Sequence, residues 1–420
     1  MHVTDANDAA ATAEAVARRS YGRLVAFLAA RTGDVAGAED ALSDAFAAAL
    51  AEWPRQGPPA NPEAWLLTVA RRKGIDAGRR RRTVWDAAGH VQLLTEELAS
   101  EGSDATAIPD DRLALLFVCA HPAIDRAVRA PLMLQAVLGF DAASIASAFL
   151  MSPAAMRQRL VRAKQKIRQA RIPFRVPDRA ELTDRLGTVL EAVYAAFAEG
   201  WADPNGTEVR RRNLAAEAIW LARLLAALLP EEPEVLGLLA LLLYSEARRR
   251  ARRDAQGDYV PLTRQDVAAW NGAMIAEAES LLRRAGAMAR PARFQIEAAV
   301  QSAHVARRLT GQIDWPAIVL LYDALAAITE SPVVAINRAV ALAETDGPAT
   351  ALAALDSRAG DGRLAEYQPY WAARADLLAR AGQNSAAWAA FQQAIGLETD
   401  PAVRRFLLQQ RDALEPVRCG

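Results

Sequence analysis

The sequence predicts an all-α protein, and three features of its 420 residues lead to that prediction. Alanine and leucine, both strong helix formers, dominate the composition, whereas aromatic residues make up only 6% of it. Apolar residues recur at helical spacing in one segment after another. Proline or an N-capping residue often stands where such a segment begins, and glycine often stands where it ends. The length predicts two or three domains.

The first clearly amphipathic segment spans residues 38–53. Leu42, Phe46, Ala49 and Trp53 share one helical face, while Glu39, Asp40 and Asp44 are expected on the exposed side. Such acids on a solvated face need have no function. Residues 53–60 are rich in turn formers and predict a loop. A second helix is expected from Asn61, and it ends in a basic block that contains Arg71, Arg72, Lys73, Arg79, Arg80, Arg81 and Arg82.

A helix-turn-helix is predicted between Phe140 and Arg175. A short amphipathic segment at 141–150 is followed by Ser152 as N-cap and Pro153 at the first position of a new helix. In that second helix, Met156, Leu160, Ala163 and Ile167 form one narrow apolar stripe. The opposite face carries Ala154, Gln158, Val161 and Gln165, and it is flanked by Arg157, Arg159, Arg162, Lys164, Lys166 and Arg168.

Such a helix fits the major groove of DNA, where small and amide side chains reach base edges and arginines reach the phosphates on either side. A solvated basic face on an ordinary helix would show the same charges. The matched short helix before it, with a short turn between the two, favours the DNA-binding interpretation.

The two motifs together resemble a known family. Residues 37–46 and 64–76, followed by the arginine run 79–82, resemble region 2 of sigma-70 family RNA polymerase sigma factors, and more narrowly the extracytoplasmic-function (ECF) subfamily. The helix-turn-helix then corresponds to sigma region 4.2, with 152–164 matching its recognition helix. The resemblance implies region 2 at 10–85, an acidic linker at 86–110, region 4 at 111–177 and a helical regulatory domain at 178–420.

The resemblance also implies roles for individual residues. Asp40, Ser43 and Asp44 match positions where the family docks on the beta-prime clamp of RNA polymerase, although the family often has Gln where Ser43 stands. Residues 53–62 match the loop that receives an unstacked base. The implied DNA contacts are Arg71, Arg72 and Asp76 at the −10 element, Arg79, Arg80, Arg81 and Arg82 at phosphates, and Arg157, Gln158, Arg159, Arg162, Lys164, Lys166 and Arg168 in region 4.

The expected partners are therefore promoter DNA and core RNA polymerase, through its beta-prime clamp and beta subunits. The polymerase supplies the catalysis, so the chain is expected to be no enzyme and to need no cofactor. Residues 96–111 carry six acids and no basic residue. A flexible acidic linker explains them, whereas the resemblance implies a strand that threads the polymerase cleft.

The segment after Pro177 predicts a long series of helices. The expected spans are 182–201, 210–229, 234–253, 264–285, 291–310, 316–328, 332–344, 348–356, 370–380, 385–397 and 403–414. Trp371, Ala375, Gly382, Ala387, Phe391 and Ala394, before Asp400-Pro401, follow tetratricopeptide spacing. Ala339 lies 36 residues before Ala375 and indicates a preceding unit. Such repeats stack into concave surfaces for a peptide or protein partner.

Three further segments, 314–323, 331–339 and 370–378, resemble the signatures of ECF sigma factors with a long C-terminal tetratricopeptide-like extension. That resemblance covers nearly the whole chain. It implies regulation through the extension and not through a separate membrane anti-sigma factor.

No catalytic or metal-binding constellation is recognisable. The chain has four histidines and two cysteines, and it shows no phosphate loop and no nucleophile elbow. Cys119 and His121 lack a second pair of ligands, so a buried helix end is the expected explanation. No apolar run is long enough to cross a membrane, and a cytoplasmic location is expected. Two other classes of protein stay open: a helix-turn-helix regulator with a helical sensor domain, and a helical-repeat scaffold.

Overall fold

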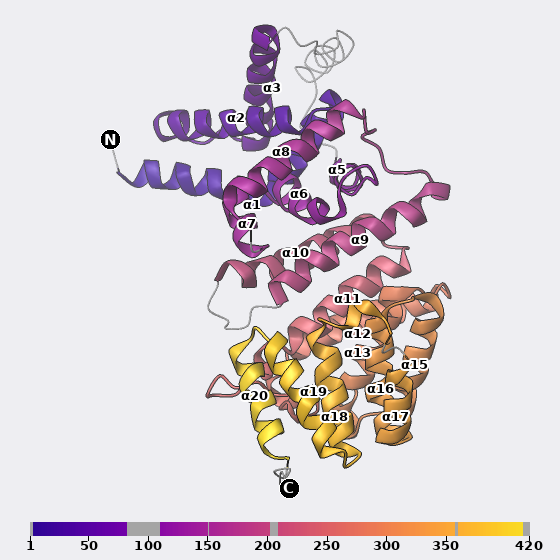
Figure 1. Cartoon of the computed structure of the whole chain (residues 1–420). Coiled ribbons are helices and arrows are strands. Elements are labelled where there is room, and N and C mark those ends of the chain that lie inside the picture. The colour runs from indigo at the N-terminus through magenta and orange to yellow at the C-terminus, as the bar shows by residue number, and fades with distance from the viewer. Residues whose placement is uncertain (1–2, 82–109, 150, 202–208, 358–359, 415–420) are drawn as a thin grey trace. The chain divides into compact units, whose positions relative to one another are not determined.

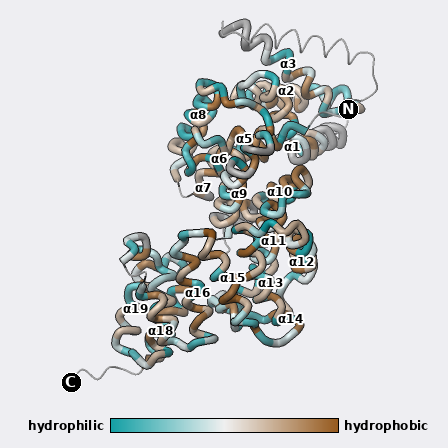
Figure 2. The backbone as a smooth tube through the Cα atoms, turned by 90° about the vertical axis from the view of Figure 1, so that its right-hand side faces the viewer, coloured by the Kyte–Doolittle hydropathy of each residue, from teal (hydrophilic) through white to brown (hydrophobic). Residues whose placement is uncertain are grey.

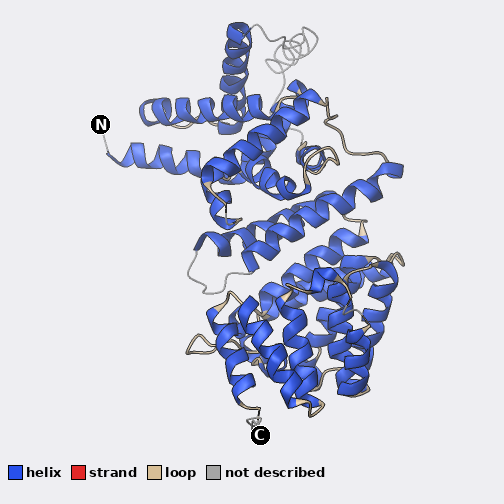
Figure 3. Cartoon of the chain, viewed as in Figure 1, coloured by secondary structure: helices blue, strands red, loops and turns tan. Residues whose placement is uncertain are grey.

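The computed structural model describes residues 3–81, 110–149, 151–201, 209–357 and 360–414 (Figure 3). Within these residues the regular elements are all helices, and an isolated bridge between Arg253 and Tyr259 is the one β-type pairing. The predicted all-α fold class is confirmed. The chain divides into two compact units. The first runs to Trp201 and includes Arg210–Ala218, and the second continues from Ile219.

The first unit contains the predicted region 2 and region 4 segments (Figure 1). Its helices are α1 (Val3–Thr32), α2 (Val35–Gln56), α3 (Pro62–Arg81), α5 (Arg112–Cys119), α6 (Arg126–Leu138), α7 (Ala142–Ala148), α8 (Pro153–Gln169), α9 (Arg179–Trp201) and the first part of α10 (Val209–Leu228). Gly22 on α1 lies so close to α6 that a Cβ there would overlap the carbonyl oxygen of Val137. The absence of a side chain at Gly22 is therefore what lets α1 and α6 approach.

The structure places the end of this unit later than the sequence predicts. The predicted boundary at 177/178 falls before α9, yet α9 packs on α5 and α6. Arg185 donates from Nη2 to the carbonyl oxygen of Phe117 at 3.1 Å, and Arg126 pairs with Glu191 at 2.9 Å. The drop in basic character after residue 177 marks the end of the DNA-binding motif and not the end of the compact unit.

The second unit is an array of helices that pack mainly on their neighbours in sequence. After α10 it contains α11 (Pro233–Ala247), η1 (Arg249–Arg252), η2 (Leu262–Arg264), η3 (Val267–Ala269), α12 (Gly272–Ala287), α13 (Arg293–Val305), α14 (Arg307–Thr310), α15 (Trp315–Ile328), α16 (Pro332–Thr345), α17 (Pro348–Asp356), η4 (Gly362–Leu364), α18 (Gln368–Arg380), α19 (Asn384–Leu397) and α20 (Pro401–Asp412). Figure 2 shows hydrophobic and hydrophilic residues alternating along these helices.

Two predicted helices, 234–253 and 264–285, are shorter than expected. The chain leaves α11 at Ala247 and enters α12 only at Gly272, and short 3₁₀ turns and a loop lie between them. Gly257 has a left-handed φ of 81°, and Pro261 offers no backbone N–H for a helix. The sequence did not predict this irregular segment, because apolar residues recur at helical spacing on both sides of it.

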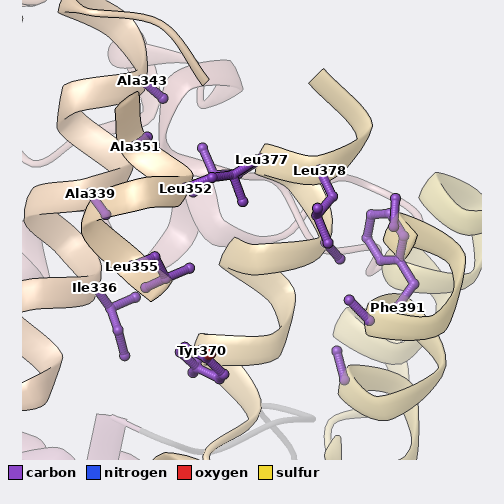
Figure 4. Close-up of a cluster of buried hydrophobic side chains, with 14 of the residues drawn as sticks. Ile336, Ala339, Ala343, Ala351, Leu352, Leu355, Tyr370, Leu377, Leu378 and Phe391 are labelled. Atoms are coloured by element: carbon purple, nitrogen blue, oxygen red, sulfur yellow. The ribbon is translucent and has the colours of Figure 1, made fainter. Parts of the chain in front are cut away.

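The repeat spacing near the C-terminus corresponds to a continuous hydrophobic core (Figure 4). Ala339 on α16 and Ala375 on α18 are both fully buried, as the 36-residue spacing predicts for equivalent positions. Leu352 and Leu355 from α17 meet Leu377 and Leu378 from α18 in one cluster, which Phe391 from α19 extends. Small residues allow the helices to approach closely, and leucine and aromatic side chains fill the space between them.

His304 on α13 gives the second unit a pH-dependent stability. Burial, together with the positive charges of Arg248 and Arg307, lowers the pKa of His304 from 6.5 to about 4. Between those two values the unfolded chain binds a proton that the folded chain does not, so stability falls as the pH decreases. We expect protonation of His304 to lower the free energy of unfolding by about 3 kcal/mol when the pH falls from 7 to 4. The replacement His304→Gln should flatten this dependence, measured as thermal melting at pH 7.5 and pH 4.5. An equal acid-induced loss in both proteins would contradict the assignment.

Candidate nucleic-acid interface

Three helices, α1 to α3, form the predicted region 2. Asp34 caps α2 by accepting from the Gly37 N–H at 3.1 Å, and Asn61 caps α3 by accepting from the Ala64 N–H at 3.1 Å. Glu63 ties the start of α3 to α1, because Ser20 donates a hydrogen bond to it and Arg23 forms an ion pair with it. These contacts fix the direction of α3 and therefore the place of its basic end.

The predicted polymerase-binding residues share one exposed face of α2. Asp40, Ser43 and Asp44 are all exposed, and their spacing of three and four residues places them side by side on the helix. On the other side of the helix, Leu42 and Ala45 are fully buried. The α2 face formed by Asp40, Ser43 and Asp44 is thus free to meet another protein.

The predicted base-receiving loop is shorter than residues 53–62. Helix α2 continues through Pro54 to Gln56, and the loop comprises residues 57–61. Trp53 is 2% exposed, and its ring lies 5.5 Å from that of Trp65 in an edge-on contact. The turn formers had predicted a loop here, but Trp53 is a core residue that joins α2 to α3.

The basic end of α3 is described only in part. Arg72 and Lys73 are exposed, whereas Arg71 is half-buried, with its guanidinium 5.3 Å from the Phe27 ring centroid. Packing on Phe27 orients Arg71 and adds a structural role to its predicted contact with the −10 element. For Asp76, Arg79, Arg80 and Arg81 the structure describes the helical backbone only, and Arg82 and the linker residues 86–109 lie outside the described residues.

The helix-turn-helix is present as predicted. Asp141 begins α7 by accepting from the backbone N–H groups of Ala143 at 2.9 Å and Ser144 at 3.0 Å, and these bonds together with the Ser144 hydroxyl lower the pKa of Asp141. Ser152 begins α8 by accepting from the Ala155 N–H at 3.2 Å. The predicted apolar stripe is the buried side of α8, formed by Met156, Leu160, Ala163 and Ile167.

The opposite side of α8 faces solvent and carries the predicted reading residues. Gln158 and Arg162 are exposed there, and Val161 between them is 57% exposed, which is unusual for an apolar side chain. A small apolar group between an amide and a guanidinium suits contact with base edges and the thymine methyl group. The remaining exposed basic residues on α8 are Arg157, Arg159, Lys166 and Arg168.

Lys164 lies apart from this exposed surface in the structure, so the DNA contact predicted for it requires its side chain to leave Glu39. Its side chain is 10% exposed and forms an ion pair with Glu39 on α2, which is itself buried. Burial raises the pKa of Glu39, and the nearby Lys164 partly opposes that effect. Glu39 was expected on the exposed side of its helix, yet it joins the predicted region 2 to the predicted region 4.

A second, more exposed ion pair lies beside the Glu39–Lys164 pair. In it, Arg168 on α8 lies 3.6 Å from Asp34 at the start of α2. Sequence reasoning missed Glu39 as a core position, although a signal was present. Glu39 lies four residues after Val35 and three before Leu42, both buried, and this spacing places it at the edge of the apolar face.

The Cys119 and His121 pair is a buried helix end, as the sequence predicts. Cys119 is the last residue of α5, and burial raises the pKa of its thiol far above the ordinary range. His121 accepts a hydrogen bond at Nδ1 from the Ala123 N–H at 3.1 Å. No helix among the described residues is long and apolar enough to span a membrane.

Comparison with known proteins agrees with this geometry. Residues 16–84, which include most of α1 and all of α2 and α3, match the family model Sigma-70 region 2. This match assigns residues 16–84 to a sigma-70 region 2 domain and supports a sigma-70 family sigma factor. Sigma-70 family proteins act in transcription initiation, with core RNA polymerase and promoter DNA as their partners, and the match supports that role here.

Two further similarities extend beyond residues 16–84. It is 41% identical over 387 residues to an uncharacterized protein of Rhizobium meliloti (strain 1021), and the alignment covers 90% of each chain. The two proteins therefore share both units. Residues 185–286 match a family of unknown function, DUF6596. No solved structure matches the chain.

Proposed function

We propose that this protein is an ECF-type sigma factor whose C-terminal helical array regulates it. The α2 face of Asp40, Ser43 and Asp44 binds the beta-prime clamp of core polymerase. The basic end of α3 contacts the −10 element, and α8 reads the −35 element. The C-terminal array resembles tetratricopeptide units, with α18 and α19 as one pair and α16 and α17 as another.

The observation that carries this proposal is the combination of a region 2 match with the α7–α8 helix pair, whose exposed basic face lies in the same unit. Region 2 alone accounts for residues 16–84. A regulator of the simple helix-turn-helix class would use α7 and α8 but would have no reason to carry α1 to α3 with an exposed acidic face. Promoter recognition uses both parts, because phosphate contacts supply affinity and base contacts supply register.

Run-off transcription tests the proposal. Purified full-length protein and core polymerase would be incubated with genomic fragments from the source organism, and transcripts would be mapped at their 5′ ends. We expect starts at a defined set of promoters that core polymerase alone does not use. Stoichiometric binding to core without any promoter-specific start would favour a scaffold, and promoter binding without core association would favour a helix-turn-helix regulator.

The two sides of α8 are expected to respond differently to substitution. Gln158→Ala and Arg162→Ala remove predicted base contacts, so each should cost about 1–3 kcal/mol at the preferred −35 sequence and relax base preference there. Lys166→Ala removes a predicted phosphate contact, so it should weaken binding to all DNA sequences alike. It should also reduce the slope of log binding constant against log salt concentration by roughly one unit. Binding of holoenzyme to promoter variants over a salt series measures both effects. Equal changes in base preference for Lys166→Ala and Arg162→Ala would refute this placement of α8.

Charge reversal on α2 tests the polymerase contact. The double replacement Asp40→Arg and Asp44→Arg should weaken binding to core polymerase at least tenfold, because juxtaposed like charges at an interface cost several kcal/mol. Glu52→Arg is the matched control, since Glu52 is an exposed acid on the same helix outside the proposed face. Surface plasmon resonance with immobilised core measures the affinities. A similar loss for Glu52→Arg would assign the effect to net charge and not to this face.

A further inference from the structure

The second unit contains a half-open cavity of about 570 Å³ between its helices. Its walls come from α13, α15, α16, α18, α19 and α20, together with the loop between η1 and η2. A volume of this size falls within the ~300–1,000 Å³ that small-molecule sites usually have. All of the lining residues belong to the second unit, so the cavity is a property of that unit alone.

One wall of the cavity carries a buried cation. Arg248, directly after α11, is 9% exposed. Its Nε donates to the carbonyl oxygen of Tyr244 at 3.2 Å and its Nη2 donates to the amide oxygen of Gln301. Neither acceptor is charged, and Arg248 forms no ion pair with any carboxylate in the described part of the chain. A buried guanidinium without a carboxylate partner is costly unless something else supplies the negative charge.

The neighbours of Arg248 increase the positive potential. The pKa of Arg248 is lowered to about 10 by burial and by the charges of Arg252 and Arg307. Arg307 donates to the carbonyl oxygens of Thr263 and Gln265, both at 2.8 Å, and its guanidinium lies 4.8 Å from the Trp270 ring centroid. Like Arg248, Arg307 therefore donates to uncharged acceptors. The field at the Arg248 end of the cavity favours an anion.

His304 adds an unsatisfied polar group to the same wall. It is 8% exposed, its Nδ1 has no hydrogen-bond partner, and its ring meets that of Trp315 edge-on at 5.6 Å. Buried polar nitrogens are normally hydrogen-bonded, so an unpartnered one in a cavity wall indicates a missing partner. Because its pKa is lowered to about 4, His304 is neutral at pH 7 and can bond a ligand without adding charge.

The remainder of the cavity suits an apolar body. Trp315, Ile318 and Tyr322 from α15, with Phe391 and Phe406 from α19 and α20, supply aromatic and aliphatic surface. The two lining carboxylates, Glu344 and Asp376, lie at 2.6 Å and 3.8 Å from Arg380 and are partly neutralised by it. Arg264 also lines the cavity and acts on Asp376, so three lining arginines face two carboxylates, and Arg248 is the one buried arginine among the three.

The loop after η1 joins the array to its last helix. Arg253 forms an ion pair with Asp400 at the start of α20, and Arg405 on α20 pairs with Asp258 at 2.7 Å. Tyr259 on this loop meets Phe406 edge-on at 5.5 Å. These contacts hold α20 in place, so that Phe406, Leu407 and Gln410 line the cavity.

We propose that this cavity binds a small organic anion, with its carboxylate or phosphate group at Arg248 and His304 and its apolar body against Trp315, Tyr322 and Phe406. Nε and Nη2 of Arg248 donate to Tyr244 and Gln301, which leaves the Nη1 amino group to donate a charge-assisted hydrogen bond to such a group. The site does not depend on transcription, so binding can be tested on the full-length protein alone.

Two fluorescent probes that differ in one charge test the proposal. The first is 8-anilinonaphthalene-1-sulfonate and the second is N-phenyl-1-naphthylamine, which has the same aromatic body without the sulfonate. We expect saturable one-to-one binding of the sulfonate, at least tenfold tighter than that of the neutral amine. Arg248→Gln should reduce that preference to about twofold. Equal affinity for both probes in the unaltered protein would overturn the proposal.

A matched control and a second variant distinguish loss of the binding site from loss of the fold. Arg284→Gln removes an exposed arginine of α12 outside the cavity and should leave both affinities unchanged. Ala372→Phe on α18 fills part of the cavity while keeping Arg248, and it should weaken both probes at least fivefold. Melting curves must match those of the unaltered protein within a few degrees. If Arg248→Gln is unfolded, Ala372→Phe decides: unchanged affinity for both probes would refute binding in this cavity.

Competition identifies the anionic group. 1-Naphthylacetate, 1-naphthyl phosphate and the neutral alcohol 2-(1-naphthyl)ethanol would each be titrated against the bound sulfonate probe. We expect one or both anions to displace it at least tenfold better than the alcohol, and the better anion tells a carboxylate site from a phosphate site. Displacement by the alcohol at the same concentration as the anions would show that apolar contact alone drives binding and would overturn the role of Arg248.

Discussion

Replacing Glu39 by Gln is expected to tighten the binding of the full-length protein to core RNA polymerase at least tenfold. The Glu39–Lys164 pair joins α2 to α8, and both side chains are about 10% exposed. If the proposed −10 and −35 contacts are made together, α3 and α8 must reach elements centred ~25 base pairs apart, about 85 Å along the duplex. Helix α8 has 17 residues and a length of only ~25 Å, so the contact between α2 and α8 has to open.

The cost of opening lowers the apparent affinity for any partner that binds only the open form. Removing one member of a buried ion pair costs about 3–5 kcal/mol, because the other charge stays buried without compensation. In Glu39→Gln that cost falls on the closed form, since Lys164 becomes hydrated once α8 separates from α2. Each 1.4 kcal/mol lost from the closed form raises the open population tenfold until it is fully populated.

Asp34→Asn is the matched control for this prediction. Asp34 faces Arg168 across the same two helices, but the Arg168 side chain is 58% exposed, and such pairs contribute about 0–1 kcal/mol. Asn at this position can still cap α2. Surface plasmon resonance with immobilised core should show a change within about twofold for Asp34→Asn. If both variants bind core equally well, or if Glu39→Gln binds no better than the unaltered protein, the ion pair does not hold the closed form.

The features that the sequence could predict were those that depend on residues within one helix. The stripe of Met156, Leu160, Ala163 and Ile167 on α8 was readable because four buried positions repeat at the period of the helix. The cap at Ser152 was readable because the bonds that begin a helix lie within three residues. The exposure of Asp40 and Asp44 followed from the same periodicity, whereas Glu39, which was expected on the same side, is buried.

The parts that sequence could not predict depend on contacts between distant segments. Lys164 and Glu39 are 125 residues apart, and each looked like a solvated charge on its own helix. Trp53 was placed on the apolar face of its helix, but the turn formers directly after it predicted a loop where α2 continues to Gln56. The cavity was not foreseen for the same reason, because Arg248, His304 and Phe406 come from three separate elements. The roles of the DNA-contacting residues remain predictions.

Deleting residues 370–420 is expected to reduce output from the cognate promoter at least tenfold without changing the −10 and −35 sequences used. The deletion removes nearly all of α18 and the whole of α19 and α20, including Leu377, Leu378 and Phe391 of the shared core. Each such side chain contributes about 2–5 kcal/mol when buried. Their combined loss of about 6–15 kcal/mol is as large as the whole free energy of unfolding, ~5–15 kcal/mol, that usually stabilises a domain.

The deletion also exposes Leu352 and Leu355 on α17 and removes Asp400, the ion-pair partner of Arg253. We therefore expect the second unit to lose its closed array, and any regulation that it exerts should be lost with it. Deletion of residues 415–420 alone is the control, because it leaves the whole buried cluster in place. Reporter output from the cognate promoter measures the effect, and immunoblotting separates loss of function from degradation. A truncated protein that accumulates normally and transcribes with full-length rate and regulation would show that the array is dispensable, and the proposed regulatory role would have to be abandoned while the promoter-reading role of the first unit remained.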